Sequence, residues 1–190
     1  MCEAGYTNVS MDASGATECR ECEAGEYKDT IGNSECLTCR QNSESGTATA
    51  TRNGCACVEG FFLQHDECTP CGLGSYKPHV SNDACFSCPL SYTTAAEQSV
   101  FSASCVCAPT LFKNTETIYA PICENCPLDT VKSEYSNSTC TACRPNSSRP
   151  IHATADTQLR CLCDPGFELQ TSTLGTVPMC VMCAQGKSRD

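Results

Sequence analysis

Cysteine offers the most chemistry in this sequence, since 21 of its 190 residues are cysteines. At this density cysteines either form disulfides in an oxidising compartment or bind zinc as thiolates. The stretch from Cys55 to Cys71 shows their arrangement: a Cys-x-Cys pair, a loop, and a Cys-x-x-Cys pair. The same order of pairs returns between residues 105 and 126 and between residues 161 and 183. A repeated cysteine pattern therefore organises the chain.

Zinc binding is the main alternative to disulfide formation. Cys68-Thr-Pro-Cys71 has the form of a zinc knuckle, and the two Cys-x-x-Cys pairs between Cys19 and Cys39 have nearly the spacing of a zinc ribbon. The interleaved Cys-x-Cys pairs fit neither motif, and the chain lacks the basic residues typical of nuclear zinc proteins. We therefore expect disulfides, no metal site and no cofactor, with an intracellular zinc-binding array as the less favoured alternative.

The composition suits a secreted disulfide scaffold. The chain has a net charge of −10, no tryptophan and few Leu, Ile, Val and Phe residues, which would normally indicate disorder. Disulfides can replace the core that such a chain cannot build, and closing a loop of about 15 residues contributes roughly 3 kcal/mol in the chain-entropy model. Because disulfides need an oxidising compartment, we expect an extracellular or cell-surface protein.

The acidity and the lack of long apolar runs argue against other classes. An acidic chain repels nucleic-acid phosphates, and its 12 scattered Lys and Arg residues form no basic patch for anionic lipid. No apolar run approaches the roughly 20 residues that span a membrane, so we expect no direct membrane insertion. Cys2 follows Met1 without a signal peptide. We therefore expect the chain to be a piece of a longer precursor, cut in mid-repeat.

The cysteine pairs divide the chain into repeats. The interval between the first two Cys-x-x-Cys pairs of a repeat is always 13 residues, whereas the interval before the Cys-x-Cys grows from 15 to 17 residues. A fixed interval indicates a constrained turn, and variable intervals indicate exposed loop tips. We expect the end of a preceding repeat at residues 1–19, repeats at 20–68, 69–123 and 124–180, and the start of a truncated repeat at 181–190.

Two recurrent motifs mark the loops of each repeat. Gly followed by an aromatic residue comes after each Cys-x-Cys, except after Cys107, and Gly-x-Tyr-Lys with a later Asn occupies the 13-residue interval. Glycine permits the positive φ of a tight turn, and Asn favours local turns. Turn formers recur every few residues, which predicts brief strands and almost no helix. The motif residues are Gly5-Tyr6, Gly60-Phe61, Gly166-Phe167, Tyr27-Lys28, Tyr76-Lys77, Val131-Lys132, Asn33, Asn82 and Asn137.

This order of motifs resembles the ephrin-receptor-like cysteine-rich repeat, which is related in style to EGF modules and to the cysteine-rich domains of tumour necrosis factor receptors. The resemblance spans the whole chain as about three complete units, from Cys22 to Cys180. It implies small disulfide-rich repeats of short β-hairpins and loops, joined as an elongated tandem EGF-like rod.

The resemblance also implies a crossed disulfide pairing, in which the first cysteine of a unit bonds to the third and the second to the fourth. A ladder of nearest neighbours satisfies the same spacings, and the sequence alone does not decide between the schemes. Both schemes contain Cys2–Cys19, Cys57–Cys68, Cys107–Cys123 and Cys163–Cys180, and both leave Cys183 unpaired. The crossed scheme, which we favour, adds Cys22–Cys39, Cys36–Cys55, Cys71–Cys88, Cys85–Cys105, Cys126–Cys143 and Cys140–Cys161.

Three Asn-x-Ser/Thr sequons, at Asn8, Asn137 and Asn146, are candidates for N-linked glycans. Chance produces such tripeptides in any chain rich in Ser and Thr, but exposed loops of a secreted repeat make them plausible acceptors. Asp66 precedes Cys68 as in calcium-binding EGF modules, yet the companion Asp and Asn positions are missing. We interpret Asp66 as part of a solvated turn.

No residue is predicted to be catalytic. His65, His79 and His152 fall in unrelated loops, without a repeated carboxylate or nucleophile partner. The sequence contains no nucleophile-elbow, zinc-protease or phosphate-binding motif. We therefore expect a non-enzymatic protein.

The recurrent residues all have scaffold roles, which favours a structural or adhesive function. We expect a rod in a larger filament, coat or stalk, with other extracellular proteins or copies of itself as partners. The alternative is a receptor ectodomain that binds a protein ligand. An exposed aromatic or arginine cluster unique to one repeat would favour that alternative, and Phe61-Phe62 is the nearest candidate.

Overall fold

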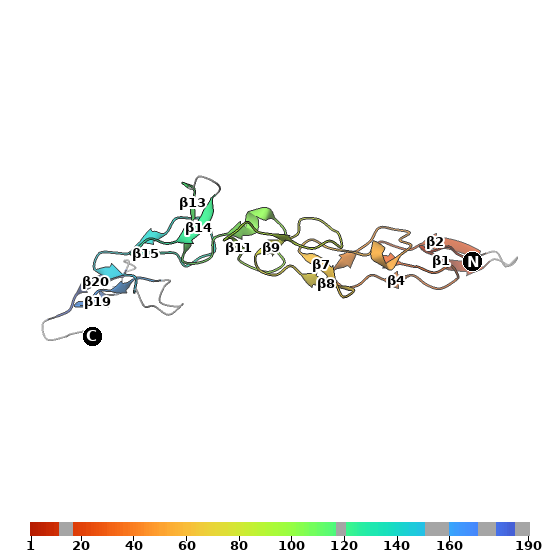
Figure 1. Cartoon of the computed structure of the whole chain (residues 1–190). Helices are drawn as coiled ribbons and strands as arrows, with labels where there is room; N and C mark the ends of the chain where they lie inside the picture. The colour runs from red at the N-terminus through yellow and green to blue at the C-terminus, as the bar shows by residue number, and fades with distance from the viewer. Residues whose placement is uncertain (12–16, 117–120, 151–159, 171–177, 185–190) are drawn as a thin grey trace. The chain divides into compact units, whose positions relative to one another are not determined.

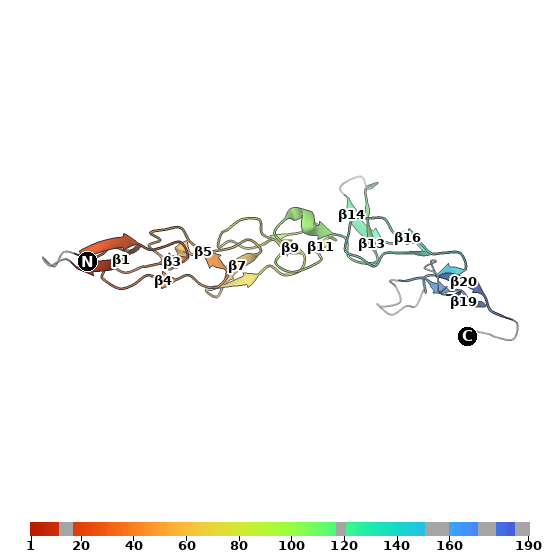
Figure 2. The same ribbon diagram turned by 180° about the vertical axis from the view of Figure 1, so that it is seen from behind.

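The computed structural model describes residues 1–11, 17–116, 121–150, 160–170 and 178–184. In these residues the secondary structure consists of two-stranded antiparallel hairpins, most with strands of two to four residues, and two short 3₁₀ turns (Figures 1 and 2). The chain forms two compact units, Met1–Cys88 with Ala96–Cys105, and Pro89–Ala95 with Val106–Asp190. The expected near-absence of helix and the short hairpins are confirmed, and the fold is one of small disulfide-rich repeats.

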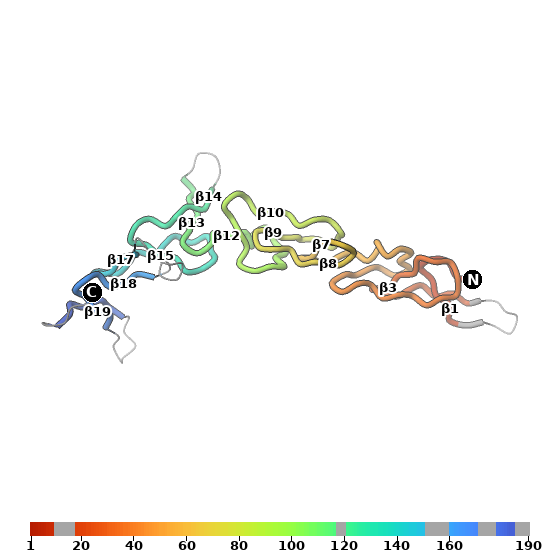
Figure 3. Tube along the Cα trace, turned by 60° about the horizontal axis from the view of Figure 1, so that its bottom comes forward, coloured from red at the N-terminus to blue at the C-terminus, as the bar shows by residue number. Residues whose placement is uncertain are grey.

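The first unit contains five consecutive hairpins, each formed by strands adjacent in sequence. The strands pair as β1–β2, β3–β4, β5–β6, β7–β8 and β9–β10. Figure 3 shows β7 beside β8 and β9 beside β10. Two 3₁₀ turns, η1 (Arg52–Gly54) and η2 (Ser102–Ser104), precede Cys-x-Cys pairs. The strands are β1 (Tyr6–Met11), β2 (Thr17–Glu21), β3 (Glu26–Tyr27), β4 (Leu37–Thr38), β5 (Ser43–Glu44), β6 (Ala56–Cys57), β7 (Phe61–Gln64), β8 (Glu67–Pro70), β9 (Ser75–Tyr76) and β10 (Phe86–Ser87).

The second unit repeats this plan. Its hairpins pair β13 with β14, β15 with β16, β17 with β18 and β19 with β20. Its strands are β13 (Leu111–Asn114), β14 (Ile122–Asn125), β15 (Thr130–Val131), β16 (Thr141–Ala142), β17 (Ser147–Ser148), β18 (Leu162–Cys163), β19 (Phe167–Gln170) and β20 (Met179–Met182). The remaining strands are β11 (Thr93–Thr94) and β12 (Cys105–Val106).

Ten disulfides join nearest neighbours, so the crossed pairing expected above is wrong. The four bonds common to both schemes are present, Cys183 has no disulfide partner, and every bonded pair has a Cα–Cα distance of 5.5–5.9 Å. The bonds Cys22–Cys36, Cys39–Cys55, Cys71–Cys85, Cys88–Cys105, Cys126–Cys140 and Cys143–Cys161 replace the expected Cys22–Cys39, Cys36–Cys55, Cys71–Cys88, Cys85–Cys105, Cys126–Cys143 and Cys140–Cys161.

Local turns explain why the chain forms a ladder. In the first repeat a tight turn, closed by a backbone hydrogen bond of 3.1 Å and with Gly25 at φ +85°, folds Cys22 back toward β4. Cys36 and Cys39 flank the two residues of β4, so they lie at opposite ends of that strand. Cys36 therefore bonds backward to Cys22, and Cys39 bonds forward to Cys55. The pairing within a repeat thus differs from the EGF-like scheme.

Sulfur and lysine, rather than a cluster of apolar side chains, fill the interior of the described chain. Among described residues, the buried hydrophobic ones are cysteines together with Tyr27. The largest fully buried side chains are those of Lys28 and Lys77, which are 1% and 2% exposed, and Lys132 is 5% exposed. Lysine is almost never fully buried without a partner, so these three residues define the candidate site.

Candidate functional site

Lys77 ties the loop that carries it to the preceding hairpin. Its Nζ donates hydrogen bonds to the backbone carbonyls of Cys57 (3.2 Å), Phe61 (2.5 Å) and Ser81. The Gly60 N–H donates in turn to the Lys77 carbonyl (3.0 Å). Side chain and backbone therefore fasten two successive disulfide loops at one point. We call this arrangement a lysine latch: a buried lysine whose ammonium is held by carbonyls of two consecutive loops.

The same latch occurs in the other repeats. Lys28 donates to the carbonyls of Tyr6 (2.6 Å) and Gly32 (2.7 Å), and Lys132 donates to those of Leu111 (2.7 Å) and Ser136 (2.5 Å). The third copy keeps its lysine although the neighbouring Gly and Tyr of the motif have been replaced. The ammonium is thus the part of the Gly-x-Tyr-Lys motif that all three repeats use in the same way.

The electrostatics of the latch suit a structural role. Burial lowers the pKa of the Lys77 ammonium, and the carboxylates of Asp83 and Glu59 raise it by less. Burial likewise lowers the pKa of Lys132, against a smaller opposing effect of Glu134. The ammonium donors point at backbone carbonyls that would otherwise lose their hydrogen bonds on burial. A lysine held in this way has no free donor or lone pair for covalent or acid–base chemistry.

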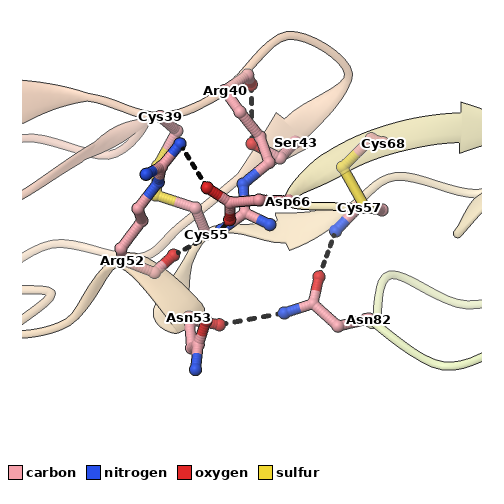
Figure 4. A network of polar contacts seen from close by, with 10 residues as sticks. All are labelled: Cys39, Arg40, Ser43, Arg52, Asn53, Cys55, Cys57, Asp66, Cys68 and Asn82. Carbon is pink, nitrogen blue, oxygen red and sulfur yellow. Dashed lines mark hydrogen bonds and ion pairs between the residues drawn. A yellow bond between two sulfur atoms is a disulfide. The ribbon is translucent and has the colours of Figure 1, made fainter. Parts of the chain in front are cut away.

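Asn82 adds a second set of hydrogen bonds between the two disulfide loops that the Lys77 latch joins (Figure 4). Its Oδ1 accepts a hydrogen bond from the Cys57 N–H (3.1 Å), and its Nδ2 donates to the Asn53 carbonyl (3.0 Å). Asn137 repeats the first contact, accepting from the Cys107 N–H at 3.3 Å. These asparagines were expected to form local turns. They instead bridge loops that are 25 to 30 residues apart.

An ion pair fastens the β7–β8 turn to the preceding loop (Figure 4). The Asp66 carboxylate lies 2.7 Å from an Arg52 guanidinium nitrogen and 3.5 Å from one of Arg40. The Arg40 side chain is 7% exposed and also donates to the Arg52 carbonyl (3.0 Å). Asp66 therefore engages two arginines and is more than the solvated turn residue that the sequence suggested.

Residues 60–105 match a family model described as tyrosine-protein kinase ephrin type A/B receptor-like. The match covers Lys77, two of its three acceptor residues, and the disulfides Cys71–Cys85 and Cys88–Cys105. Residues 60–105 therefore form an ephrin-receptor-like cysteine-rich repeat, and the recurring disulfide pattern of the neighbouring repeats resembles it. No curated protein sequence matches the chain with significance.

The ephrin-receptor-like repeat is a non-catalytic type of module. Together with the many disulfides it fits an extracellular or cell-surface receptor-like protein. Within the described ranges, no helix has the length and apolarity required to cross a bilayer. The same residues contain no group of three or more His, Cys, Asp and Glu side chains that could hold a metal ion.

The other residues predicted as candidate sites lie at separate points of the described structure. His65 lies in the β7–β8 turn and His79 lines a surface groove, while His152 lies outside the described residues. Asn146 and Asn137 are exposed, whereas Asn8 is half-buried in β1. The structure therefore does not bring these residues together into one site.

Sequence reasoning missed the role of the lysines. It identified Lys28, Lys77 and Lys132 as motif members but assigned them no function. One feature of the sequence indicated this role: the third repeat keeps the lysine although the neighbouring Gly and Tyr of the motif are replaced. A lysine exposed to solvent would not need to stay at the same motif position.

Proposed function

We propose that this chain is a non-enzymatic extracellular structural module, a disulfide-stapled array that spaces or anchors parts of a larger cell-surface or secreted assembly. The observation that carries the proposal is the threefold recurrence of the lysine latch at Lys28, Lys77 and Lys132. Each latch uses a costly buried charge only to hold one loop against the next.

The fastening at each joint supports a stiff spacer. Two residues separate Cys68, which closes one loop, from Cys71, which opens the next. The latch, the backbone bond from Gly60 and the side chain of Asn82 all act within this joint. Because every such bond must break before a loop can swing, successive loops resist bending.

Small-angle X-ray scattering of the secreted, oxidised chain tests the proposal. A compact globule of 190 residues has a radius of gyration of about 16 Å. We expect a value well above this, with intact mass and thiol labelling showing that nearly all cysteines are oxidised. A radius near that of a globule, or many free thiols with bound zinc, would overturn the proposal.

A second candidate function is that of a receptor ectodomain repeat that binds a protein ligand. An exposed aromatic cluster in one repeat supports it, because binding hot spots are rich in such residues. Phe86 and Phe101 are 54% and 65% exposed, and the ring of Phe86 stacks with that of Tyr76. Phe61 and Phe62, the candidates from the sequence, are only half-buried strand residues of β7.

We also propose N-linked glycans on the exposed sequons. Asn146 is exposed in a turn at φ +60°, whereas the Oδ1 of Asn8 is buried, and that of Asn137 accepts a hydrogen bond from Cys107. We expect occupancy to fall in the order Asn146, Asn137, Asn8, as measured by glycopeptide mass spectrometry of chain secreted from eukaryotic cells. Asn8 as the most occupied site would contradict this order.

A further inference from the structure

Three aromatic side chains gather at the surface of the repeat that matches the ephrin-receptor-like model. Tyr76 in β9 and Phe86 in β10 have ring centroids 5.8 Å apart, with an angle of 30° between the ring planes. Phe101 precedes η2 and lies on the same groove, which has a volume of about 470 Å³. We call these three residues the aromatic cluster. Pro78, His79, Ser102 and Ala103 complete the groove lining.

The scaffold does not need these aromatic residues. Leu37 occupies the position of Phe86 in the first repeat and Thr141 occupies it in the third, and both repeats form the same hairpin. Thr51 stands before η1 where Phe101 stands before η2. Because leucine and threonine support the same hairpins and turns, the fold does not require phenylalanine at these two exposed positions.

The exposed formal charges of the repeat that carries the aromatic cluster have one sign. Residues 69–105 contain three formally charged side chains, those of Lys77, Asp83 and Glu97. Lys77 is buried in its latch, while Asp83 and Glu97 are exposed. Aromatic faces carry a negative quadrupole, so the rings of the groove and the exposed carboxylates of the same repeat both favour a cation. The guanidinium of arginine fits both features, because it stacks on aromatic rings and pairs with carboxylates.

We propose that the aromatic cluster is a docking site for an arginine-bearing segment of an extracellular partner protein. Phe86 and Phe101 are more than half exposed, so the guanidinium of an extended segment can lie against their rings in the groove. Charge complementarity with Asp83 and Glu97 steers the segment to this repeat. This inference specifies a partner for the receptor-type candidate and does not depend on the spacer role.

Titration with short capped peptides, followed by NMR of the oxidised chain, tests the proposal. The probes are a peptide of alternating arginine and glycine, its lysine counterpart, and a proline-only peptide. We expect saturable binding of the arginine peptide, with shifts at Tyr76, Phe86 and Phe101, and clearly weaker binding of the other two. Binding of the proline peptide in preference would overturn the arginine assignment.

Two variants carry residues that the first repeat already uses at the same positions, so they preserve the fold. Phe86→Leu and Phe101→Thr should each weaken arginine-peptide binding about five-fold. Leu73→Thr, which changes an exposed apolar residue outside the groove lining, is the matched control and should leave binding unchanged. Unchanged thiol counts and hairpin NMR shifts confirm that each variant folds.

The outcomes separate this proposal from the spacer role. Binding that is lost in high salt but is equal in Phe86→Leu, Phe101→Thr and wild type would show attraction to the acidic chain alone and overturn the proposal. Self-association that both variants abolish would assign the groove to a second copy and also overturn it. Neither result changes the radius of gyration on which the spacer proposal depends.

Discussion

At the scale of single residues, the lysine latch substitutes for an apolar core. Burying an ammonium is costly, but each latch offsets that cost with several hydrogen bonds from the ammonium to backbone carbonyls. Lys77 reaches the carbonyls of Cys57, Phe61 and Ser81, which belong to two different disulfide loops. A single side chain thereby sets the relation between two loops that no disulfide connects directly.

Replacing Lys77 with methionine should be strongly destabilising, because methionine fills the space but removes three hydrogen bonds to backbone carbonyls, of which the Cys57 carbonyl keeps only its bond from the Ser81 N–H. Hydrogen bonds to charged groups are worth about 1.5–3 kcal/mol each in net terms, and we expect a loss of roughly 2–3 kcal/mol. Unfolding of the oxidised protein in guanidinium chloride measures this loss in the free energy of unfolding. Lys113→Met, at a half-buried lysine of β13 outside any latch, is the control, and an equal loss there would contradict the role of the latch.

The lowered pKa values of two latch lysines also predict how the free energy of unfolding changes with pH. Burial lowers the pKa of Lys77 and Lys132 below 10.5 in the folded state, so the unfolded chain binds more protons between the lowered value and 10.5. This contribution to stability is complete above pH 10.5 and is lost as pH falls through the folded pKa. As the pH is raised, we expect NMR titration of the lysine Nζ signals to show Lys77 and Lys132 deprotonating earlier than a lysine with the ordinary pKa of 10.5. A later deprotonation would reverse the predicted sign.

At the scale of elements, the hairpins were predictable but their connections were not. Turn formers and the fixed 13-residue interval predict short hairpins directly, yet the crossed and ladder pairings fit the same spacing. The turn at Gly25, which places Cys22 beside Cys36, decides between them, and it is a three-dimensional property. The aromatic cluster was hidden for the same reason. Phe86 and Phe101 share a groove because the Cys88–Cys105 bond folds the loop between them.

The Gly-aromatic turn offers a matched pair of substitutions. Gly60 lies at φ +77°, where an added Cβ would stand 2.6 Å from the Gln98 carbonyl oxygen, and Thr110 occupies the equivalent turn at φ +70°. Gly60→Ala should destabilise by about 1–3 kcal/mol, and Thr110→Gly should stabilise by about 1 kcal/mol by relieving strain. Denaturant midpoints measure both. If both variants changed stability in the same direction, the positive φ at these two turn positions would not have the same effect on stability.

At the scale of the whole molecule, stability rests on covalent bonds and the latches that they position. The described interior is made of disulfide sulfur and buried lysine, and large apolar side chains such as Leu73, Leu90 and Leu128 are exposed. Each latch needs the loops on both sides to be closed before its carbonyls converge on one ammonium. We therefore expect that breaking the disulfides also breaks the hydrogen bonds of the latches.

Reduction should consequently unfold the entire chain at once. Without disulfides the net charge of −10 and the missing apolar core favour the expanded state, with a radius of gyration approaching about 47 Å for 190 unfolded residues. We expect loss of all protected amides in hydrogen exchange after reduction and alkylation, while mock-alkylated oxidised protein keeps them. Zinc added to the reduced, unalkylated chain should restore none of them, because the bonds that hold each hairpin loop closed are disulfides. Recovery of protected amides on adding zinc would mean that the thiols, rather than the disulfides, carry the fold, and would reinstate the zinc-binding alternative.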